Sequence, residues 1–433
     1  MRTTLITVRL ELTAPGGVAG PERSHPAPPS TEDGRNGTRN DLPLRRDPDG
    51  DLHLPGTSVA GSLRAHCTGN GFPAELFGLP DPQNRPRASA IQVLGVRLHA
   101  TTTEPHWTTR VAIDRHRGAP RANALFSAEQ LPAGTTFDVY LRWDDPSDEL
   151  TQFSTLLRTW SPRLGRGITT GAGTCTVTAL GQRDYDLSTA DGLASWLAET
   201  APDDYPQPDT PVDPPDHAED VVDVELTIID GLHVGSGAVT PEPGREGKVA
   251  RILRDPARRP RIPGSSLKGV LRSRAEYICR VLGLASCPEG AVASCGDCLP
   301  CAIFGWSPRA GDDRTGARGS VVVHDAVIEY DGEPVEFRPH VALDRVTGGQ
   351  RPGLLYTDEV AVAGRFRLRV EPLRPPTPAE SALLNAIIAD LHEGLVGIGS
   401  ATTRGLGTVR VTGGRWQPPD LTTLAETLGA VRV

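Results

Sequence analysis

The chain contains 433 residues, 23% of them charged, and carries a formal net charge of −9 at pH 7. This length suits two domains of about 200 residues, each with its own core. No stretch approaches the roughly 18 apolar residues of a membrane span, and the first residues lack the apolar segment of a signal peptide. We therefore expect a cytoplasmic protein with no membrane partner, whose seven cysteines are reduced or metal-bound rather than disulfide-bonded.

Apolar periodicity predicts strands and helices that follow one another in a similar order in each half of the chain. Each half opens with a strand, continues with a Pro-Gly-Thr-Ser or Pro-Gly-Ser-Ser element that begins a helix, and ends near a Gly-rich loop. We expect Ser or Thr to cap these helices. Predicted strands cover residues 4–12, 136–142, 221–229, 320–327, 364–370 and 407–411, and a further helix covers residues 378–391.

Four sequence segments occur twice in the same order, at an offset that grows from 208 to 234 residues. The pairs are 54–64 with 262–272, 74–78 with 302–305, 111–115 with 341–345, and 165–173 with 397–407. A period this long indicates a tandem fusion of whole domains rather than a solenoid of short units. We call the two halves the first and second copy.

The predicted boundaries follow from the repeat and from composition. We expect a first domain at residues 1–200, a linker at 201–220, a second domain at 221–415 and a tail at 416–433. The linker holds six prolines and six aspartates, which stiffen and solvate such a segment. In each domain the order of elements predicts an α+β fold built on a ferredoxin-like sheet with additions. Many RNA-binding modules share this fold, but the fold alone does not give function.

The two Pro-Gly elements carry the side chains of a candidate phosphate site. Backbone N–H groups at a helix start, with hydroxyl and cationic side chains nearby, can bind an anion. The alternative is a simple cap on a buried helix. Lysine supports the first interpretation, because only Lys248 and Lys268 occur in the chain and both flank the second element. The candidate RNA-binding residues here are Ser58 and Arg64 in the first copy, and Ser265, Ser266, Lys268 and Arg272 in the second.

Residues 113–126 and 341–356 predict projecting β-hairpins. Each has an arginine near its expected base, Arg115 or Arg345, and an aromatic residue near its expected far end, Phe126 or Tyr356. Such an arm can hold phosphate and wedge bases apart. The alternative is an ordinary solvated hairpin.

Four cysteines predict a metal site in the second copy. Cys287, Cys295, Cys298 and Cys301 have the spacing C-x7-C-x2-C-x2-C, which suits a tetrahedral structural Zn²⁺ site. An iron–sulfur cluster and buried thiols without a metal are alternatives. The first copy has no matching cysteines, which favours a local clamp over a catalytic metal.

Taken together, these motifs resemble the RAMP superfamily of CRISPR-associated proteins, in particular the backbone subunits of type III effector complexes. The resemblance rests on the strand followed by Gly-Leu-His-Val-Gly-Ser-Gly, the Ile-Pro-Gly-Ser-Ser-Leu-Lys-Gly element, Cys-x-x-Phe-Gly, the Asp-Arg hairpin and the final Gly-rich loop. It spans almost the whole chain, once per copy, and the second copy is closer to the pattern. It implies two tandem RAMP domains with thumb hairpins, and as partners a guide CRISPR RNA, a target RNA and other type III effector subunits.

The resemblance also implies a site of RNA cleavage. In cleaving members, an aspartate shortly before the Arg-Asp-Pro and Pro-Gly elements promotes cutting of target RNA beside each thumb. Asp41 matches this position in the first copy, whereas Val249 matches it in the second, with Glu246 nearby in a loop of uncertain alignment. The first copy instead has Ala60 where the second keeps Lys268. We expect cleavage in the first copy only, with Mg²⁺ or another divalent ion as cofactor.

Two alternative functions remain open at this point. One is a non-catalytic guide-RNA-binding scaffold of the same complex. The other is a metal-independent, guide-processing endoribonuclease on the same fold, which would need a histidine as general base, with His53 or His233 as candidates.

Overall fold

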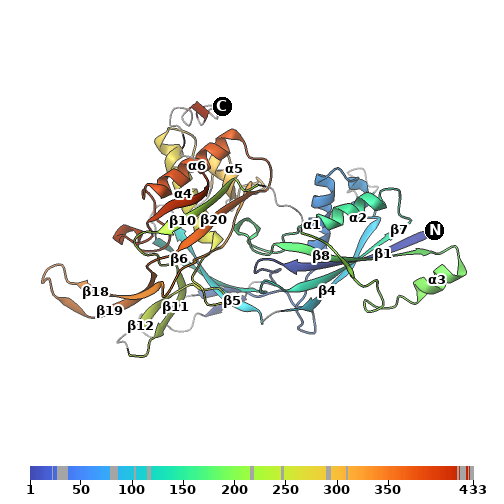
Figure 1. Ribbon diagram of the computed structural model, residues 1–433, viewed down its shortest axis with the longest axis horizontal. Helices are drawn as coiled ribbons and strands as arrows, with labels where there is room; N and C mark the ends of the chain where they lie inside the picture. Colours follow the sequence, from blue (N-terminus) through green and yellow to red (C-terminus); the bar gives the residue numbers. More distant parts are fainter. Residues whose placement is uncertain are drawn as a thin grey trace. The chain divides into compact units, whose positions relative to one another are not determined.

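The computed structural model describes residues 1–21, 23–26, 38–78, 86–101, 104–114, 119–214, 219–244, 248–288, 294–308 and 311–416, with positions 419, 426, 427 and 429 beyond them. The chain divides into two compact units, which are described separately here (Figure 1). The first comprises Met1–Thr108, Leu125–Ile168 and Ala172–His217, and the second comprises Thr109–Ala124, Thr169–Gly171 and Ala218–Val433. Two short segments of the first copy therefore belong to the second unit.

The first copy forms two sheets, and its predicted opening strand lies in the larger one. The five-stranded sheet has the order β4 (Ile91–Ala100), β7 (Thr136–Asp144), β1 (Arg2–Leu12), β8 (Cys175–Asp186) and β9 (Thr210–Pro211). The four-stranded sheet has the order β2 (Arg23–Pro26), β3 (Thr38–Leu42), β6 (Ala119–Gln130) and β5 (His106–Asp114). In the larger sheet β1 is antiparallel to both of its neighbours.

The second copy repeats both sheets in the same order. The larger sheet runs β16 (Val321–Val323), β20 (Arg365–Pro372), β10 (Val222–Ile228) and β21 (Val409–Arg415). The smaller sheet runs β11 (Gly235–Pro241), β12 (Lys248–Ile252), β19 (Gln350–Ala361) and β18 (Val335–Leu343). Two-stranded ladders join β13 (Arg261–Ile262) to β17 (Ala326–Val327), and β14 (Gly305–Trp306) to β15 (Ala317–Arg318). The repeat read from the sequence is thus also a repeat of strand order.

The two copies share irregularities as well as regular pairing. The ladder between β1 and β8 shifts register between Arg9 and Leu10, and the ladder between β10 and β21 shifts between Glu225 and Leu226. In each smaller sheet one pair of strands is parallel, β3 with β6 and β12 with β19. A bulge and a parallel pair that recur at matching places indicate a common backbone plan rather than a chance similarity of motifs.

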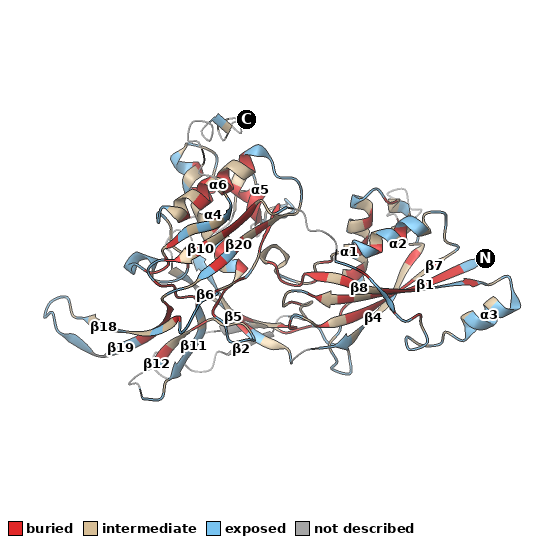
Figure 2. Ribbon diagram, in the orientation of Figure 1, coloured by how far each residue is buried: buried red, intermediate tan, exposed pale blue. Residues whose placement is uncertain are grey.

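In each unit, helices cover one face of the larger sheet. In the first unit, α1 (Gly56–Gly69) and α2 (Leu150–Arg158) lie over the sheet, and α3 (Ala190–Leu197) contacts β8. In the second, α4 (Gly264–Val281) and α6 (Pro378–His392) pack on each other and on the sheet, with α5 (Leu299–Phe304) beside α4. Short 3-10 turns are η1 (Ala74–Phe77), η2 (Ile168–Thr170) and η3 (Thr402–Arg404). Buried residues concentrate between helices and strands (Figure 2).

The helix α6 shows why some boundaries are readable from sequence. Thr377 accepts a hydrogen bond from the backbone N–H of Glu380, and the Glu380 side chain accepts one from the N–H of Thr377. This reciprocal cap, with Pro378 at the first helical position, fixes the start predicted at residue 378. The mixed α+β class is confirmed.

The expected Ser or Thr caps on α1 and α4 are wrong. Pro55 and Pro263 occupy the N-cap positions, and neither provides a side-chain cap. Gly264 instead donates its N–H to Asp325 Oδ1 at 2.7 Å. Proline cannot donate, but its fixed φ suits the residue that precedes the first helical turn. The hydroxyl residues lie two and three positions after each proline, inside the helix.

The Pro/Asp-rich segment at 201–220 carries some structure of its own. The strand β9, within it, pairs with β8 through Thr210 and Leu180. Val212 is 8% exposed and belongs to the core of the first unit. Part of this segment therefore packs on the first unit. Within the described residues, no helix combines the length and apolar character needed to cross a membrane.

In the hairpin of the second copy, the arginine and the aromatic residue lie at the opposite ends from those expected. Asp344 Oδ1 accepts hydrogen bonds from the N–H groups of Val346 and Thr347, at 3.0 and 2.9 Å, and so closes a turn between β18 and β19. Arg345 therefore lies in the turn at the tip, not at the base. Tyr356 lies further along β19, opposite His340. The reason is the Asp side chain, which mimics a backbone turn and starts the reversal earlier than the glycines alone suggest.

Candidate functional site

Asp41 lies on the short strand β3 of the first unit and is partly exposed. Its backbone is opposite Arg23 of β2 on one side and opposite Ser127 of β6 on the other. Ser127 is fully buried. Asp41 is thus held on a strand between two neighbouring strands.

Val249 occupies the matching place in the second copy. In β12 it is opposite Thr357 of β19, as Asp41 is opposite Ser127 of β6. The next residues also correspond, because Leu42 is opposite Ala128 and Ala250 is opposite Asp358. Val249 is only 1% exposed. The strand register therefore matches Val249 with Asp41, as counting back from the Arg-Asp-Pro elements does. Glu246 lies outside the described residues.

The Arg-Asp-Pro elements form the same turn in both copies. Asp47 Oδ1 accepts hydrogen bonds from the N–H groups of Asp49 and Asp51, at 3.0 and 2.9 Å. Arg46 donates to the carbonyl of Gly50, which has a φ of 92°. Asp47, an acid close to Asp41 in the sequence, therefore uses its carboxylate to close this turn.

In the second copy, Asp255 accepts from the N–H of Arg259 at 2.8 Å. Arg254 donates to the carbonyl of Arg258, which has a φ of 67° where the first copy has Gly50. The Arg-Asp-Pro motif is thus a device that closes a turn and aims its arginine at one carbonyl.

Two glutamates that the sequence did not single out contact these turns. Glu129 of β6 accepts hydrogen bonds from the N–H of Leu44 and from Arg46 Nη2, both at 2.8 Å. Glu359 of β19 has the equivalent contacts in the second copy. The sequence carried a signal for both glutamates, because residues 125–129 (Leu-Phe-Ser-Ala-Glu) return at an offset of 230 as residues 355–359 (Leu-Tyr-Thr-Asp-Glu).

The Gly-rich loops dock on the segment that follows each opening strand. Gly173 donates to the carbonyl of Pro15 at 3.1 Å, and Gly407 donates to the carbonyl of Gly231 at 2.7 Å. Both glycines have positive φ, 68° and 84°, and a side chain on either would collide with the carbonyl of Leu164 or Ile398. These two positions therefore require glycine.

His233 serves this docking rather than presenting an imidazole to solvent. It is 6% exposed, its carbonyl accepts from the N–H of Ser400 at 2.9 Å, and its Nδ1 donates to the carbonyl of Glu359 at 2.6 Å. His53, in the first unit, is exposed, and its N–H donates to the carbonyl of Arg45.

The start of α4 already holds a carboxylate. Besides Gly264, Asp325 accepts from Arg261 Nη1 at 2.9 Å, so its two oxygens hold the first helical N–H and a cation. Ser265 is exposed and Ser266 is partly buried. Because a protein acid occupies the first N–H group, an anion at this end cannot use that donor. In the first copy, Ser58 and Arg64 are partly exposed on α1.

Lys268 is more buried than an ordinary phosphate-binding lysine. Its Nζ donates to Thr169 Oγ1 at 2.7 Å, and both residues belong to the second unit. Burial, with a smaller contribution from the nearby Arg272 charge, lowers the pKa of the Lys268 ammonium to about 8. The ammonium remains mostly charged at pH 7 but is sensitive to mildly basic pH.

Arg272 directs its guanidinium into the protein. It donates to Glu276 Oε1, to the carbonyl of Gly305 and to Ser294 Oγ, at 3.0, 2.6 and 2.8 Å. A longer contact of 3.4 Å joins its Nη2 to Cys301 Sγ. With these contacts and a side chain only 13% exposed, Arg272 stabilises the cysteine loop instead of facing a phosphate.

The two hairpin residues of the second copy, Arg345 and Tyr356, have different surroundings. Arg345 is exposed at the tip beside Val346, which is 94% exposed. Tyr356 stacks on His340, with ring centroids 5.0 Å apart, and its hydroxyl accepts a hydrogen bond from Arg404 at 2.7 Å. Arg115 lies outside the described residues.

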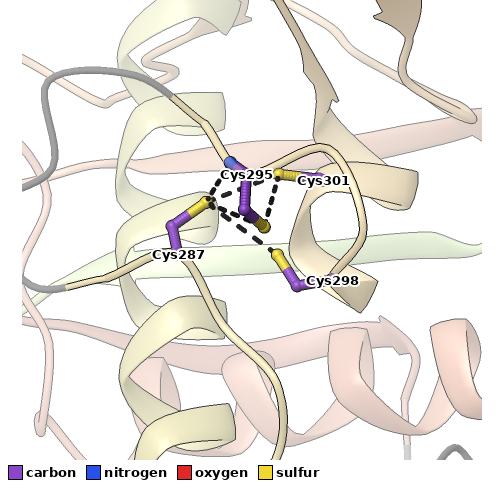
Figure 3. Close-up of side chains that lie close together, drawn as sticks. All are labelled: Cys287, Cys295, Cys298 and Cys301. Carbon is purple, nitrogen blue, oxygen red and sulfur yellow. Dashed lines mark hydrogen bonds between the residues drawn. The ribbon is translucent and has the colours of Figure 1, made fainter. Parts of the chain in front are cut away.

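The four cysteine sulfurs face a common centre (Figure 3). Cys287 Sγ lies 3.8, 3.9 and 3.4 Å from the sulfurs of Cys295, Cys298 and Cys301, and Cys295 Sγ lies 3.9 Å from Cys301 Sγ. Four thiolates about 2.3 Å from one tetrahedral zinc ion lie about 3.8 Å apart. The spacing therefore fits a single ion and is far too long for disulfides.

The contacts within the cluster favour a thiolate at one of the four cysteines. The pKa of the Cys301 thiol is lowered, chiefly because the Cys298 thiol donates a hydrogen bond to it, and the Arg272 charge acts in the same direction. That same hydrogen bond raises the pKa of Cys298, and burial raises the pKa of Cys287. A thiolate is the form that binds metal. Among the described residues, these cysteines are the group of His, Cys, Asp or Glu side chains placed to hold a metal such as zinc.

The repeat, its motifs and the cysteine cluster can now be compared with known proteins. The family model of the RAMP superfamily matches residues 13–176 and 225–410, once in each copy. The chain belongs to the RAMP superfamily. The two matches place Asp41 and the cysteine cluster inside separate RAMP regions.

One curated relative is similar over a shorter stretch. The CRISPR system Cms endoribonuclease Csm3 of Methanothermobacter thermautotrophicus is 38% identical over 86 residues. The alignment covers 20% of this RAMP protein and 32% of the relative. The similarity therefore links the chain to a named endoribonuclease through about a third of that protein's length.

Proposed function

We propose that this chain is a double RAMP subunit of a type III CRISPR effector complex, which binds guide RNA and cleaves complementary target RNA at Asp41. Each copy is proposed to be a ferredoxin-like domain whose hairpin acts as a thumb. Membership of the RAMP superfamily and the similarity to a CRISPR endoribonuclease support the class of complex. The protein is proposed to act in the cytoplasm.

The observation that carries the cleavage proposal is the asymmetry between Asp41 and Val249. The two residues share one register position, but only the first copy offers a carboxylate there, and it is partly exposed. A buried valine cannot orient or accept a proton from a ribose hydroxyl. One catalytic copy and one non-catalytic copy follow from this difference.

The chemistry requires the ribose 2′-hydroxyl to lie in line with the phosphorus and the 5′-oxygen that leaves. Asp41 is proposed to orient that hydroxyl or to accept its proton, leaving a 2′,3′-cyclic phosphate and a 5′-hydroxyl. A divalent ion such as Mg²⁺ would neutralise phosphate charge. It is commonly bound by one or two carboxylates together with phosphate oxygens, so Asp41 fits as the single protein ligand.

RNA contacts are proposed at cations and hydroxyls that are exposed or partly exposed. The described candidates are Ser58 and Arg64 in the first copy, and Ser265, Ser266, Lys268 and Arg345 in the second. Arg115 is proposed by analogy with Arg345. Arg272 is left out because its donors are used inside the protein. At the tip, Val346 is the apolar residue proposed to separate bases, in place of Tyr356.

A structural Zn²⁺ is proposed at the four cysteines. The sulfur spacing supports a single tetrahedral ion over an iron–sulfur cluster, whose several metal atoms would hold the cysteines further apart. All four cysteines are needed as ligands, which leaves no open position for catalysis.

The test uses the full-length chain, assembled with its guide RNA and effector subunits, and a labelled complementary RNA. We expect Asp41→Asn to abolish cutting at one register while guide retention is unchanged. Unchanged cutting at every register would refute the assignment of Asp41. A wild-type complex that binds target but never cuts it would favour the scaffold function, and cutting of repeat RNA without a guide would favour the processing nuclease.

A further inference from the structure

A buried glutamate connects the strand that carries Asp41 to the strand beside it. The Glu129 side chain is 8% exposed on β6. One carboxylate oxygen accepts from the N–H of Leu44, and the other accepts from Arg46 Nη2, both at 2.8 Å. A carboxylate this buried is stable only when its oxygens are satisfied, so these contacts are a requirement of the fold.

The second copy repeats both contacts at Glu359, whose Oε1 also lies 3.5 Å from Arg251 Nη1, where the first copy has Pro43. The Glu359 side chain is 6% exposed on β19. It accepts from the N–H of Ile252 at 2.8 Å and from Arg254 Nη2 at 3.0 Å. We call each set a glutamate clamp, consisting of one glutamate, one backbone N–H and one arginine of the Arg-Asp-Pro turn.

The clamp lies just beyond the end of the β3–β6 ladder, because β3 ends at Leu42. The Pro43 carbonyl accepts from the N–H of Gly20, and the N–H of Arg45 donates to the carbonyl of Val18, so these two residues face away from β6. The N–H that faces β6 here is that of Leu44, and Glu129 takes it. The clamp thus anchors the end of a five-residue strand that has few ladder bonds of its own.

Register decides which way Asp41 faces. Successive strand residues point to opposite faces, so a slip of one residue would turn the Asp41 carboxylate to the other side of the sheet. The observed register sets Asp41 opposite Ser127, and Glu129 lies two residues beyond Ser127 on the same strand. An anchor at Glu129 therefore fixes the position of Asp41 directly.

We propose that Glu129 is a positioning residue for RNA cleavage, acting through the register of β3 on β6; this rests on the proposed role of Asp41. Glu359 makes the same clamp around a strand that carries Val249, so its clamp positions no catalytic group. The chain thus contains an internal control: two clamps that share the backbone N–H and the Arg-Asp-Pro arginine, of which only one lies beside the proposed catalytic carboxylate.

The test compares Glu129→Gln with Glu359→Gln in the full-length chain assembled with guide RNA. Glutamine keeps the size of glutamate but offers one acceptor and one donor, so either the backbone N–H or the arginine loses its acceptor. The measurements are the single-turnover cleavage rate at each register and the affinity for a labelled complementary RNA. Hydrogen exchange of residues 38–46 in the free chain reports the strand directly.

We expect Glu129→Gln to slow the Asp41-dependent cut by about tenfold to 100-fold, since a misplacement of about 1 Å can cost on the order of 100-fold. Target affinity should not change, and hydrogen exchange in residues 38–46 should become faster. Glu359→Gln should change neither the cleavage rate nor the exchange of residues 38–46. A wild-type rate with Glu129→Gln, or equal slowing by both variants, would overturn the proposal, because equal slowing indicates only a general loss of stability.

Two further variants keep the outcomes separable. If Glu129→Gln does not assemble, Arg46→Lys compared with Arg254→Lys gives the same contrast, because lysine keeps the charge but loses the planar guanidinium. Asp41→Asn is measured alongside. If cutting is insensitive to Asp41→Asn, the proposed function fails; if it depends on Asp41 but not on Glu129, only the positioning role fails.

Discussion

Asp41 and Val249 occupy one register position in two copies of the same sheet, the first opposite Ser127 and the second opposite Thr357. The strands around them have the same order, so the difference is one of side chain alone. A carboxylate that is partly exposed in the first copy is replaced by a valine that is 1% exposed in the second.

This relationship predicts that a carboxylate cannot simply be restored in the second copy. Val249→Asp would place an unpartnered charge where no water reaches, at a cost on the order of 3 kcal/mol. We expect a lower unfolding temperature by calorimetry and no second cut in the target RNA. Val249→Thr, of similar size and uncharged, is the control and should be destabilised less. A stable Val249→Asp protein with a new cut would contradict this account.

Removing one cysteine ligand should release the metal. We expect Cys295→Ser to lower zinc content well below one ion per chain, measured by elemental analysis, and to destabilise the second unit by several kcal/mol. Cys279→Ser is the matched control, because Cys279 is buried on α4 of the same unit but lies outside the cluster. Equal zinc content in both variants and the wild type would rule out the four-cysteine site.

Lys268 should make stability depend on pH in the basic range. Its folded pKa is about 8 against an ordinary 10.5, so between these values the unfolded chain holds more protons. Stability therefore rises with pH through this window, whereas below about pH 8 the full cost of burying the charge is present. Relative to Lys268→Met, we expect the wild type to gain at most about 3 kcal/mol in free energy of unfolding from pH 8 to 10.5.

Denaturant unfolding of the wild type and of Lys268→Met at several pH values measures this difference. If the difference in free energy of unfolding between the wild type and Lys268→Met does not change with pH, the Lys268 ammonium is solvated in the folded chain.

Two arginines that look alike in the sequence should respond differently to substitution. Arg345→Ala should weaken RNA binding and lower the slope of log affinity against log salt by about 0.7, as expected for one contact to single-stranded phosphate. Arg272→Ala should leave that slope unchanged but lower zinc retention, because its guanidinium contacts Cys301 and the carbonyl of Gly305. A reduced slope with Arg272→Ala would show that this side chain does reach RNA.

The sequence determined those features that depend on neighbours along the chain. The tandem repeat, the α6 start at Thr377-Pro378 and the cysteine cluster were all predictable, because motif order, helix caps and metal ligands within fifteen residues are local properties. The Asp41–Val249 equivalence was also readable, since the Arg-Asp-Pro turns that follow them are local landmarks.

The tertiary structure decided everything that depends on contacts between distant segments. The contacts of Glu129 and Glu359 became visible only when strand pairing brought them to Leu44 and Ile252, 85 and 107 residues away along the chain. Arg272 changed from a candidate phosphate ligand to a support of the cysteine loop for the same reason. Composition and spacing show which charges a segment carries, but only the folded chain shows which of them are already satisfied from within, because burial and hydrogen bonding are properties of the whole packing.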